Sequence, residues 1–435
     1  MSLPVLALAI DRPGRGTTCL RVVRSDEAIF SKDCFAPLAM TQMRKNSIMF
    51  FQETINNLDQ KGLKRSLRLL DGAQKERVIF DGQEVLNFCS NNYLGLADHP
   101  LLKSAAISAI KQNGFGSGAS RLVCGNMSVH EKLEEKLAKF KGAEASLIFN
   151  SGYAANVGII SSVFGRGDII FSDKLNHASI IDGIILSQAE MKRYPHCDMD
   201  ALEEMLKKSS GYKKRGIITD SVFSMDGDLA PLDKIVALAK TYDCLVMIDE
   251  AHSFGVMGKN GKGLAEHFGV ENEIDIQMGT FSKAAGSFGA YVCGSKDLIA
   301  FLMNKARSFI YTTSLPPSVC AASLAGVEII EKDPQLRIKL LENTNYLRSG
   351  IKQLGFDTLN SQTPIIPILV KDSEVCIEFS KRLFNEGILI TAIRPPTVPA
   401  NTARLRLTVM ATHVRRDLDA CLEKLKKIGK NLAII

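Results

Sequence analysis

A lysine among small and apolar residues is the first candidate for chemistry in this 435-residue sequence. Lys283 closes the stretch Thr280-Phe281-Ser282-Lys283, which follows the largely apolar run 274–278 and precedes Ala284-Ala285. A lysine at the end of a buried strand loses hydration, so its pKa falls and its amine becomes a nucleophile suited to Schiff-base chemistry. Most single lysines are solvated surface charges, so Lys283 needs partners before it predicts a reaction.

An aspartate 34 residues earlier ends the most apolar predicted strand, in Asp249-Glu250-Ala251-His252. A buried carboxylate is costly without a partner. The protonated ring nitrogen of pyridoxal phosphate is one such partner, and the pairing lets the ring accept electrons. The alternative is Mg²⁺ bound by a helicase DEAH motif, which requires a G-x-x-x-x-G-K-[ST] loop. The segment 258–263 does not match that loop, so a helicase function is excluded.

A phosphate group could bind where another strand ends. Ser151-Gly152-Tyr153 follows the predicted strand 146–149 and opens a helical run, so backbone N–H groups and the helix dipole would face an anion there. Thr280 would add a hydroxyl. The glycine-rich segment 114–118 lacks the spacing of a dinucleotide fingerprint, so a nicotinamide enzyme is not supported.

Two further polar residues follow predicted strands. His177 comes after strand 169–171 and could stack on a flat cofactor ring, although a single histidine is more often a structural residue. Ser224 follows strand 216–219 and could hydrogen-bond the phenolic oxygen of that ring. In open α/β sheets ligands bind beyond the carboxyl ends of the strands, so we expect these residues to share one edge.

The elements that position these residues alternate strands with helices, which predicts an α/β fold with a large, mostly parallel sheet and helices on both faces. The candidate strands are 146–149, 169–171, 216–219, 245–248, 274–278 and 289–293. A helix over 128–140 would start at a capping box formed by Ser128 and Glu131. A helix is expected over 49–70, a hairpin with an Asp-Gly turn over 78–88, and a long helical stretch over 318–354. After it, strands near 365–370, 388–391 and 405–409 and helices near 373–386 and 414–430 indicate a smaller α+β domain.

Composition and charge limit the function classes. The net charge is +7. Seven Lys/Arg against four Asp/Glu lie within the first 48 residues, so the rest of the chain carries only +4. This excess is too small to predict nucleic-acid binding. No apolar run approaches the length of a membrane span. Ten scattered cysteines without a C-x-x-C pair indicate neither disulfides nor zinc and favour a reducing cytoplasm.

The chain is predicted to have four parts. Residues 1–48 lack the basic start of a secretory signal and contain acidic residues that argue against a transit peptide, so we expect a loosely structured extension. Residues 49–95 form an N-terminal helix and hairpin arm, 96–317 the large domain with the candidate site, and 318–435 the small domain.

Five motifs in this order resemble those of the α-oxoamine synthases, over roughly 49–435. They are Ser90-Asn91-Asn92-Tyr93-Leu94-Gly95-Leu96, Gly116-Ser117-Gly118-Ala119-Ser120-Arg121, the segment 222–227, Asp249-Glu250-Ala251-His252 and Thr280-Phe281-Ser282-Lys283. The family consists of homodimeric, pyridoxal-phosphate-dependent enzymes of fold type I. The set is highly specific. Ala284-Ala285 and Phe281 depart from the common Ala-Leu and Leu without touching a polar role.

The resemblance implies a role for each matched residue. It implies catalytic roles for Lys283, which would form the Schiff base, for Asp249 at the ring nitrogen and for His177 on the ring face. Ser224 and His252 would lie near the phenolic oxygen, and Gly152, Tyr153 and Thr280 would hold the phosphate. Tyr311 and Thr312 match a loop that reaches the neighbouring subunit's phosphate site. Substrate would contact Arg68, Asn91, Thr397 and Arg406, with Arg406 on the amino-acid carboxylate. No metal is implied.

Within the family, the segments 392–399 and 402–407 resemble those of the members that act in biotin synthesis. These members condense L-alanine with a pimeloyl thioester and release CO₂. Siblings that use glycine or serine are the alternative, and a catalytically silent subunit is disfavoured because Lys283 is present. The acyl carrier, coenzyme A or an acyl carrier protein, stays open, and the basic residues Lys61, Lys64, Arg65 and Arg68 would suit either. We expect a cytoplasmic homodimer without nucleic-acid or membrane partners.

Overall fold

A computed structural model describes residues 42–61 and 63–435. It divides into the units Met1–Leu67 and Arg68–Ile435, and helix α1 (Gln42–Gln60) is the described element of the first. The predicted helix over 49–70 is wrong beyond Gln60, because 63–69 has no regular structure. The sequence places Gly62 there, a residue that favours a helix end. Of the extension expected over 1–48, residues 1–41 lie outside the described part and α1 covers the rest.

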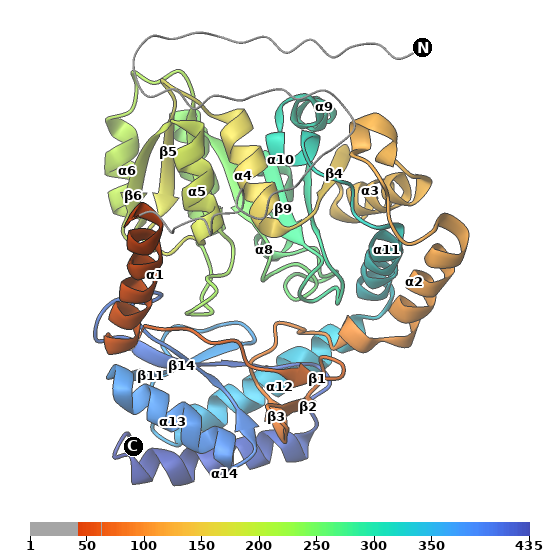
Figure 1. The fold of residues 1–435 in the computed structure, drawn as a ribbon. Helices are drawn as coiled ribbons and strands as arrows, with labels where there is room; N and C mark the ends of the chain where they lie inside the picture. Colours follow the sequence, from red (N-terminus) through yellow and green to blue (C-terminus); the bar gives the residue numbers. More distant parts are fainter. Residues whose placement is uncertain (1–41, 62) are drawn as a thin grey trace, which may run out of the picture. The chain divides into compact units, whose positions relative to one another are not determined.

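The largest sheet has seven strands in the order β4-β10-β9-β8-β7-β5-β6 (Figure 1). Their bounds are β4 (Ala145–Phe149), β5 (Ile169–Asp173), β6 (Glu190–Tyr194), β7 (Arg215–Asp220), β8 (Leu245–Asp249), β9 (Ile276–Thr280) and β10 (Ala290–Gly294). Only β10 runs antiparallel, between β4 and β9. The mostly parallel sheet is therefore confirmed. The sequence reading missed the edge strand β6, whose residues are mainly polar and exposed.

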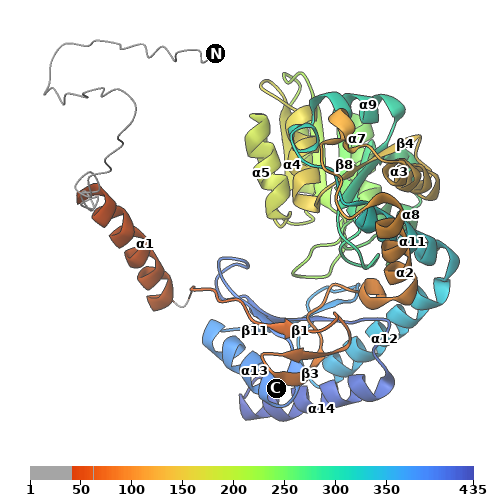
Figure 2. The same ribbon diagram turned by 45° about the vertical axis from the view of Figure 1, so that its right-hand side comes forward.

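Helices cover both faces of this sheet, and alternate strand residues separate the two cores. Ile218 on β7 packs with α4 (Gly152–Val163), α5 (Ala178–Ser187), α9 (Lys296–Lys305) and α10 (Arg307–Ile310). Its neighbour Ile217 packs with α3 (Ser128–Lys141), α6 (Met199–Lys207), α7 (Leu232–Tyr242) and α8 (Leu264–Phe268). Figure 2 shows α4 and α5 on the opposite side of the sheet from α3 and α8. Helices α2 (Pro100–Asn113) and α11 (Pro317–Lys332) pack on each other, and α11 also packs on α3.

The C-terminal part forms an antiparallel sheet of order β11-β14-β13, from β11 (Ile365–Lys371), β13 (Thr391–Ile393) and β14 (Ala403–Thr408). Helix α13 (Ser373–Asn385) packs on this sheet, and α14 (Arg415–Asn431) packs on α13 and α12 (Pro334–Gln353). The expected single helical stretch 318–354 is two helices, because Pro334 starts α12 and the Asp333 side chain accepts a hydrogen bond from the Gln335 N–H.

A fourth set of strands contains the predicted hairpin. It consists of β1 (Leu70–Asp71), β2 (Arg77–Phe80), β3 (Gln83–Asn87) and β12 (Ile388–Leu389). The turn residues Asp81 and Gly82 have φ values of 50° and 79°, which fits a type I′ turn. Strand β3 pairs in parallel with β12, so the hairpin extends strands of the C-terminal part.

Short elements complete the described chain: η2 (Leu96–Asp98), η3 (Arg121–Gly125) and η4 (Glu271–Glu273). Helix α3 was expected to have Ser128 and Glu131 as a capping box, and this is wrong by one residue. His130 Nδ1 accepts from the Met127 N–H, while Glu131 accepts from the Asn126 side chain.

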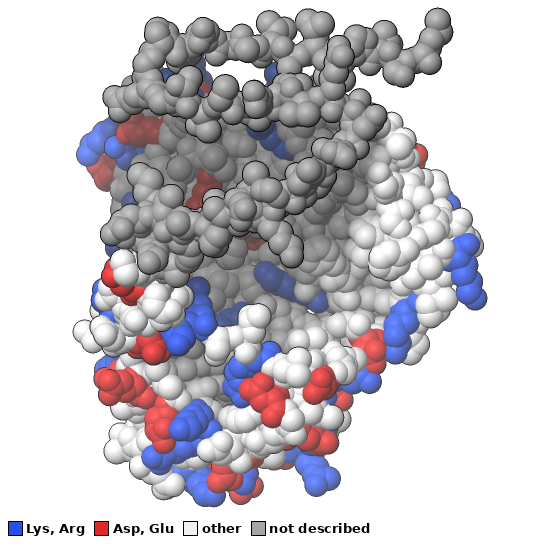
Figure 3. Space-filling model, in the orientation of Figure 1, with Lys and Arg blue, Asp and Glu red and all other residues white. Residues whose placement is uncertain are grey.

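Surface charges of both signs are interspersed in the lower part of the face shown in Figure 3. Over α13 and α14, for example, Glu386 pairs with both Lys424 and Lys427. Among residues 42–61 and 63–435, none of the helices has the length and apolarity that crossing a membrane requires.

Candidate active site

The polar residues expected at strand ends meet at the carboxyl edge of the seven-stranded sheet. Asp249 ends β8, Lys283 follows β9, Ser224 follows β7, His177 follows β5 and Gly152 begins α4 after β4. They surround one cavity of about 200 Å³, called here the inner cavity. Its lining comprises Gly152, Tyr153, His177, Ser179, Asp220, Ser224, Asp249, Ala251, His252, Met278, Thr280, Ser282 and Lys283.

The amine of Lys283 is set for nucleophilic chemistry. Burial lowers its pKa from 10.5 to about 8, against the opposing effect of the carboxylates of Asp249 and Asp220, while the Arg406 charge lowers it further. A substantial share of the amine is therefore neutral just above neutral pH, as Schiff-base formation requires.

The carboxylate of Asp249 is buried and held in a fixed direction. Its Oδ2 accepts from Asn156 Nδ2 at 2.8 Å, and its Oδ1 accepts from the Ala251 N–H at 2.8 Å. The adjacent strand places Asp220 directly beside it. Burial, followed by the negative charge of Asp249, raises the pKa of Asp220 well above its ordinary value. Asp220 also accepts from the His177 N–H at 2.8 Å, so it fixes the loop that carries this histidine.

Both histidines of the inner cavity are neutral at physiological pH. Burial lowers the pKa of His177, whose Nδ1 lies 2.7 Å from Ser179 Oγ. Burial also lowers the pKa of His252 well below 6.5 and raises that of Tyr93 to about 12. The Tyr93 hydroxyl lies 2.7 Å from His252 Nδ1 and donates to Asn91 Oδ1 at 3.3 Å. Because Nδ1 contacts Tyr93, Nε2 is the His252 ring nitrogen left to face a ligand, such as the phenolic oxygen expected there.

An arginine from the C-terminal sheet reaches the same region. Arg406 on β14 is buried, with its Nε donating to the Ser224 carbonyl at 2.5 Å and its Nη2 to Asn91 Oδ1 at 3.1 Å. The structure thus brings together Asn91, Ser224 and Arg406. The guanidinium lies close enough to affect the pKa of Lys283 and keeps donors for a carboxylate.

Thr397 lines a second, larger cavity of about 670 Å³, called here the outer cavity. This cavity shares His177 and Ser224 with the inner cavity, so the two are neighbours. Its walls come from residues 174–178, 223–226 and 396–399, together with Arg193 and Arg404. The exposed Lys174 and Arg193 give it a cationic side.

Besides Asn91, Thr397 and Arg406, three more expected site residues do not line the inner cavity of this chain. Arg68 donates to Asp81 at 2.6 Å and stacks over the rings of Phe80 and Phe384. Tyr311 is largely exposed beneath the Arg307 guanidinium. Thr312 accepts a hydrogen bond from Asn150 Nδ2 at 2.9 Å.

The sequence reading missed several residues of the site: Tyr93, Asn156, Ser179, Asp220 and Ser282. Asn156 lies one helical turn after Gly152, so the i, i+4 spacing was an available signal for a side chain on the same face. Glu250, by contrast, is structural. It forms a fully buried ion pair with Lys141 and accepts from the Ala265 N–H.

The residues present fit pyridoxal phosphate. Ser151 Oγ caps α4 by accepting from the Ala154 N–H, and the helix N-terminus faces the cavity at Gly152 and Tyr153. A Cβ at position 152 would meet only Met278 Cε, at 3.4 Å, so the backbone is open to a phosphate. The Thr280 and Ser282 hydroxyls, the Lys283 amine and the Asp249 carboxylate supply the other donors and acceptors that this cofactor requires.

Comparisons with known proteins agree with this arrangement. The family model for aminotransferase class I and II matches residues 83–425. The chain is 52% identical to 8-amino-7-oxononanoate synthase of Geobacter sulfurreducens, over 88% of this chain and 98% of that protein. It is 48% identical to the enzyme of the same name from Thermoanaerobacter pseudethanolicus, over 89% and 98%.

Two solved structures share the fold. Serine palmitoyltransferase from Sphingomonas wittichii matches with a TM-score of 0.85 at 29% identity, over 91% of this chain and 99% of that one. 8-Amino-7-oxononanoate synthase from Francisella tularensis matches with a TM-score of 0.71 at 31% identity, over 81% and 99%. The chain belongs to the fold-type I, pyridoxal-phosphate-dependent class I and II aminotransferase family and, within it, to the 8-amino-7-oxononanoate synthases.

Proposed function

We propose that this chain catalyses the decarboxylative condensation of L-alanine with a pimeloyl thioester, giving 8-amino-7-oxononanoate, CO₂ and the free carrier, a step of biotin synthesis. One observation carries the proposal. In a chain 52% identical to a named synthase, Lys283 and Asp249 line a cavity of cofactor size next to a larger one, and Arg406 donates to Ser224, which lines both.

Pyridoxal phosphate, when bound, supplies an aldehyde that takes up the amino group and a ring that accepts electrons from Cα. Lys283 then acts as the base. Its amine has a pKa of about 8, so it is poised to take the Cα proton of alanine near neutral pH. Asp249, fixed by Asn156 and Ala251, would pair its negative charge with the ring nitrogen of the cofactor.

The remaining residues orient the substrates. Arg406 holds the alanine carboxylate through its uncommitted N–H groups, and its bonds to Ser224 and Asn91 fix its direction. His177 offers an uncharged ring face above the cofactor, which suits stacking better than an imidazolium. His252 donates to the phenolic oxygen from the nitrogen opposite Tyr93.

The acyl donor occupies the outer cavity, with Thr397 among its contacts. Its thioester carbon reaches the inner cavity past His177 and Ser224, which line both. Lys174 and Arg193 attract the anionic groups of the donor. The assignment of Tyr311 and Thr312 to the partner's phosphate site, the homodimer and a cytoplasmic location belong to the same proposal. The location is supported by the cysteines, all free thiols within the described residues.

A turnover assay tests the proposal. Purified enzyme with pyridoxal phosphate is given L-alanine, glycine or L-serine, each with pimeloyl-coenzyme A, pimeloyl-acyl carrier protein or palmitoyl-coenzyme A. We expect CO₂ and 8-amino-7-oxononanoate only from alanine with a pimeloyl donor. Efficient turnover of serine with palmitoyl-coenzyme A, and none of alanine, would instead establish a sibling synthase.

A further inference from the structure

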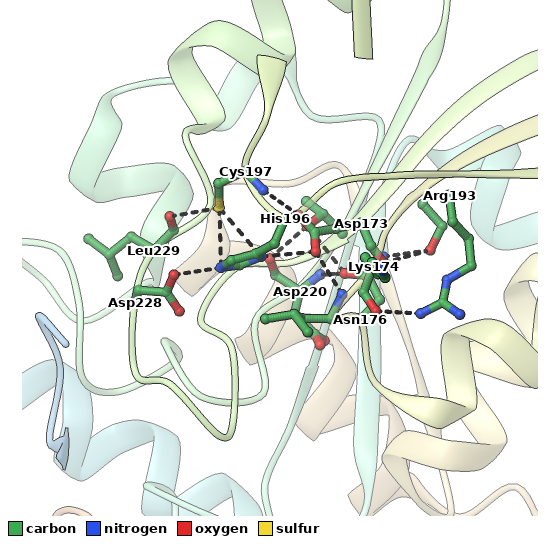
Figure 4. A network of polar contacts seen from close by, with 12 residues as sticks. Asp173, Lys174, Asn176, Arg193, His196, Cys197, Asp220, Asp228 and Leu229 are labelled. Carbon is green, nitrogen blue, oxygen red and sulfur yellow. Dashed lines mark hydrogen bonds and ion pairs between the residues drawn. The ribbon is translucent and has the colours of Figure 1, made fainter. Parts of the chain in front are cut away.

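A histidine outside the inner cavity lies between two carboxylates. His196, two residues after β6, has Nδ1 at 3.0 Å from Asp173 Oδ1 and Nε2 at 2.7 Å from Asp228 Oδ2 (Figure 4). Asp173 is the buried last residue of β5, and Asp228 lies in the segment after β7. We call the three residues the clamp.

The ring of His196 carries a positive charge at physiological pH. Burial alone would lower its pKa, but the hydrogen bonds to Asp173 and Asp228 outweigh burial and raise the pKa to about 12. The other titratable groups around the clamp are the Cys197 thiol, the Tyr194 phenol, Asp220 and Asp226. Asp226 is itself paired with Arg404. The imidazolium is thus the cation that neutralises the two clamp carboxylates.

The ring geometry favours ion pairing over metal binding. Asp173, His196 and Cys197 offer donor atoms within 4.8 Å of one another, a spacing compatible with a metal ion. Both ring nitrogens, however, already face carboxylate oxygens at hydrogen-bond distance. A metal ligand needs a free lone pair on a neutral imidazole, and an imidazolium has none.

The clamp joins two loops that carry site residues. Asp173 accepts from the N–H groups of Leu175 and Cys197, both at 2.8 Å, so it anchors the start of the segment that leads to His177. On the other side, Asp228 closes the segment that contains Ser224. The ring of Phe223 meets the His196 ring edge-on at 4.4 Å. Segments 174–178 and 223–226 are also two walls of the outer cavity.

From this geometry we infer that His196 is a positioning residue: by linking Asp173 to Asp228 it fixes the distance between His177 and Ser224 and the width of the outer cavity. The inference rests on the proposed function, since it assigns the acyl donor to that cavity. Loss of the link lets the walls separate and weakens donor binding more than alanine binding, because Arg406, which holds alanine, is also anchored by Asn91 outside the two linked segments.

Kinetics of His196→Gln test the inference. Glutamine keeps one hydrogen bond but not the charge or the second link. We expect the KM for pimeloyl-coenzyme A to rise on the order of tenfold, as for one lost charge-assisted bond, and the KM for alanine to change less than twofold. His267→Gln, an exposed histidine on α8, is the matched control and should change neither. Equal changes in both KM values for His196→Gln would overturn the inference.

A second measurement uses the wild-type enzyme, so its result does not depend on whether a variant folds. In full-length enzyme with ¹³C-labelled histidine rings, the His196 resonance should stay that of an imidazolium up to at least pH 9. A titration midpoint below pH 8 would overturn the inference, whatever the substrate. Stoichiometric Zn²⁺ binding that depends on His196 and Cys197 would do so too, by identifying a metal site. Absence of any turnover with pimeloyl donors would refute the proposed function while the NMR titration still decides the clamp.

Discussion

At the scale of single residues, the site depends on which charges are buried together. Lys283, Asp249 and Asp220 share the inner cavity, and Arg406 adds a second cation nearby. Burial lowers the pKa of the lysine to about 8. Its positive charge is unfavourable in the cofactor-free protein, and this free-energy cost is removed when the amine becomes neutral or forms a covalent bond.

Lys283→Met should therefore stabilise the cofactor-free enzyme. The folded-state pKa of about 8 lies below the unfolded value of 10.5, so the unfolded chain binds the extra proton between these values. Wild-type stability then rises with pH in this window. At pH 7 the variant should be more stable by about 3 kcal/mol, and the difference should shrink as pH approaches 10.5.

Chemical denaturation of the cofactor-free proteins at several pH values measures this difference. Lys283→Arg, which stays charged, serves as the control and should be no more stable than wild type at any pH. A stability gain of Lys283→Met that is independent of pH would show that the amine is not charged at pH 7 or is not buried.

Some site residues could be predicted from sequence and others could not, for a physical reason. Lys283 and Asp249 follow apolar strands, and a polar residue at such a position has few alternatives to a ligand site. Asp220 ends strand β7 and carries the same strand-end signal, but its contact with the loop of His177 depends on the tertiary fold, as does the contact of Tyr93 with His252. The position of Arg68 against Asp81 depends likewise on the tertiary fold.

At the scale of elements, loops after parallel strands carry the chemistry and neighbouring elements fix their shape. The segment after β7 turns back at Gly227, whose φ is +71° and whose carbonyl accepts from the Gln362 N–H and Thr363 Oγ1. A Cβ there would lie 2.2 Å from the Ile365 carbonyl oxygen. This glycine is required by both conformation and space.

Gly227→Ala should cost about 2–4 kcal/mol of stability, from the positive φ and the overlap with β11. It should also lower turnover by displacing Ser224 from Arg406. Thermal unfolding and kcat measure the two effects. Gly269→Ala, with φ +68° but open space around it, isolates the conformational part and should cost about 1 kcal/mol. Equal losses of stability for Gly227→Ala and Gly269→Ala would refute the close contact between position 227 and Ile365.

Strand alternation on β6 gives a prediction about the acyl donor. Arg193 lines the outer cavity together with Lys174, whereas the adjacent Lys192 pairs with Glu190. Replacing both Lys174 and Arg193 by alanine should raise the KM for pimeloyl-coenzyme A roughly tenfold, with a weaker salt dependence.

Lys192→Ala is the matched control and should leave the donor KM unchanged. The N-acetylcysteamine thioester of pimelate, which lacks the carrier phosphates, then identifies the recognised anion. If the double variant raises the KM only for pimeloyl-coenzyme A, Lys174 and Arg193 bind the carrier phosphates. If it raises the KM for both donors, they bind the carboxylate of the acyl chain. An unchanged KM for both donors would place the thioester elsewhere.

Element boundaries were predicted well where apolar periodicity was strong and poorly where it was absent. Strands β5, β7, β8 and β9 are buried on both faces and read clearly from sequence. Strand β6 pairs on one side only, so its polar residues resemble a loop. The sequence pattern does not separate α11 from α12, because both segments have helical periodicity and only Pro334 marks the boundary between them.

At the scale of the whole molecule, Tyr311 and Thr312 raise the question of a shared site. Within this chain they do not line the inner cavity, and Tyr311 is 72% exposed, which suits a contact with a second copy. Mixing Lys283→Ala subunits with Tyr311→Ala/Thr312→Ala subunits should recover activity that neither variant has alone. Each hybrid dimer would contain one site with an intact lysine and an intact partner loop.

Subunit exchange followed by a turnover assay measures the recovery, with sedimentation confirming the dimer. Recovery should approach half of the wild-type rate per hybrid dimer. If the two residues served the site of their own chain, the hybrid would contain no better site than the variant homodimer, and no activity would return.

The parallel α/β arrangement of the whole molecule was predictable, because helix and strand patterns alternate along the chain and right-handed crossovers leave few topologies. The position of β10 was not. Its apolar sequence resembles that of a parallel strand, and only pairing with β4 and β9 reverses its direction. The pairing of β3 with β12, about 300 residues apart, likewise has no local signal.

The reversed strand has a consequence for how this enzyme can change. Because β10 separates β4 from β9, the backbone holds Gly152 and Lys283, the proposed phosphate and aldehyde ends of the cofactor site, about two strand widths, roughly 10 Å, apart. Backbone hydrogen bonds set that spacing, and side-chain exchange cannot alter it. A descendant of this chain could therefore acquire new substrates through residues 174–178 and 396–399, yet it would keep a cofactor of the same length.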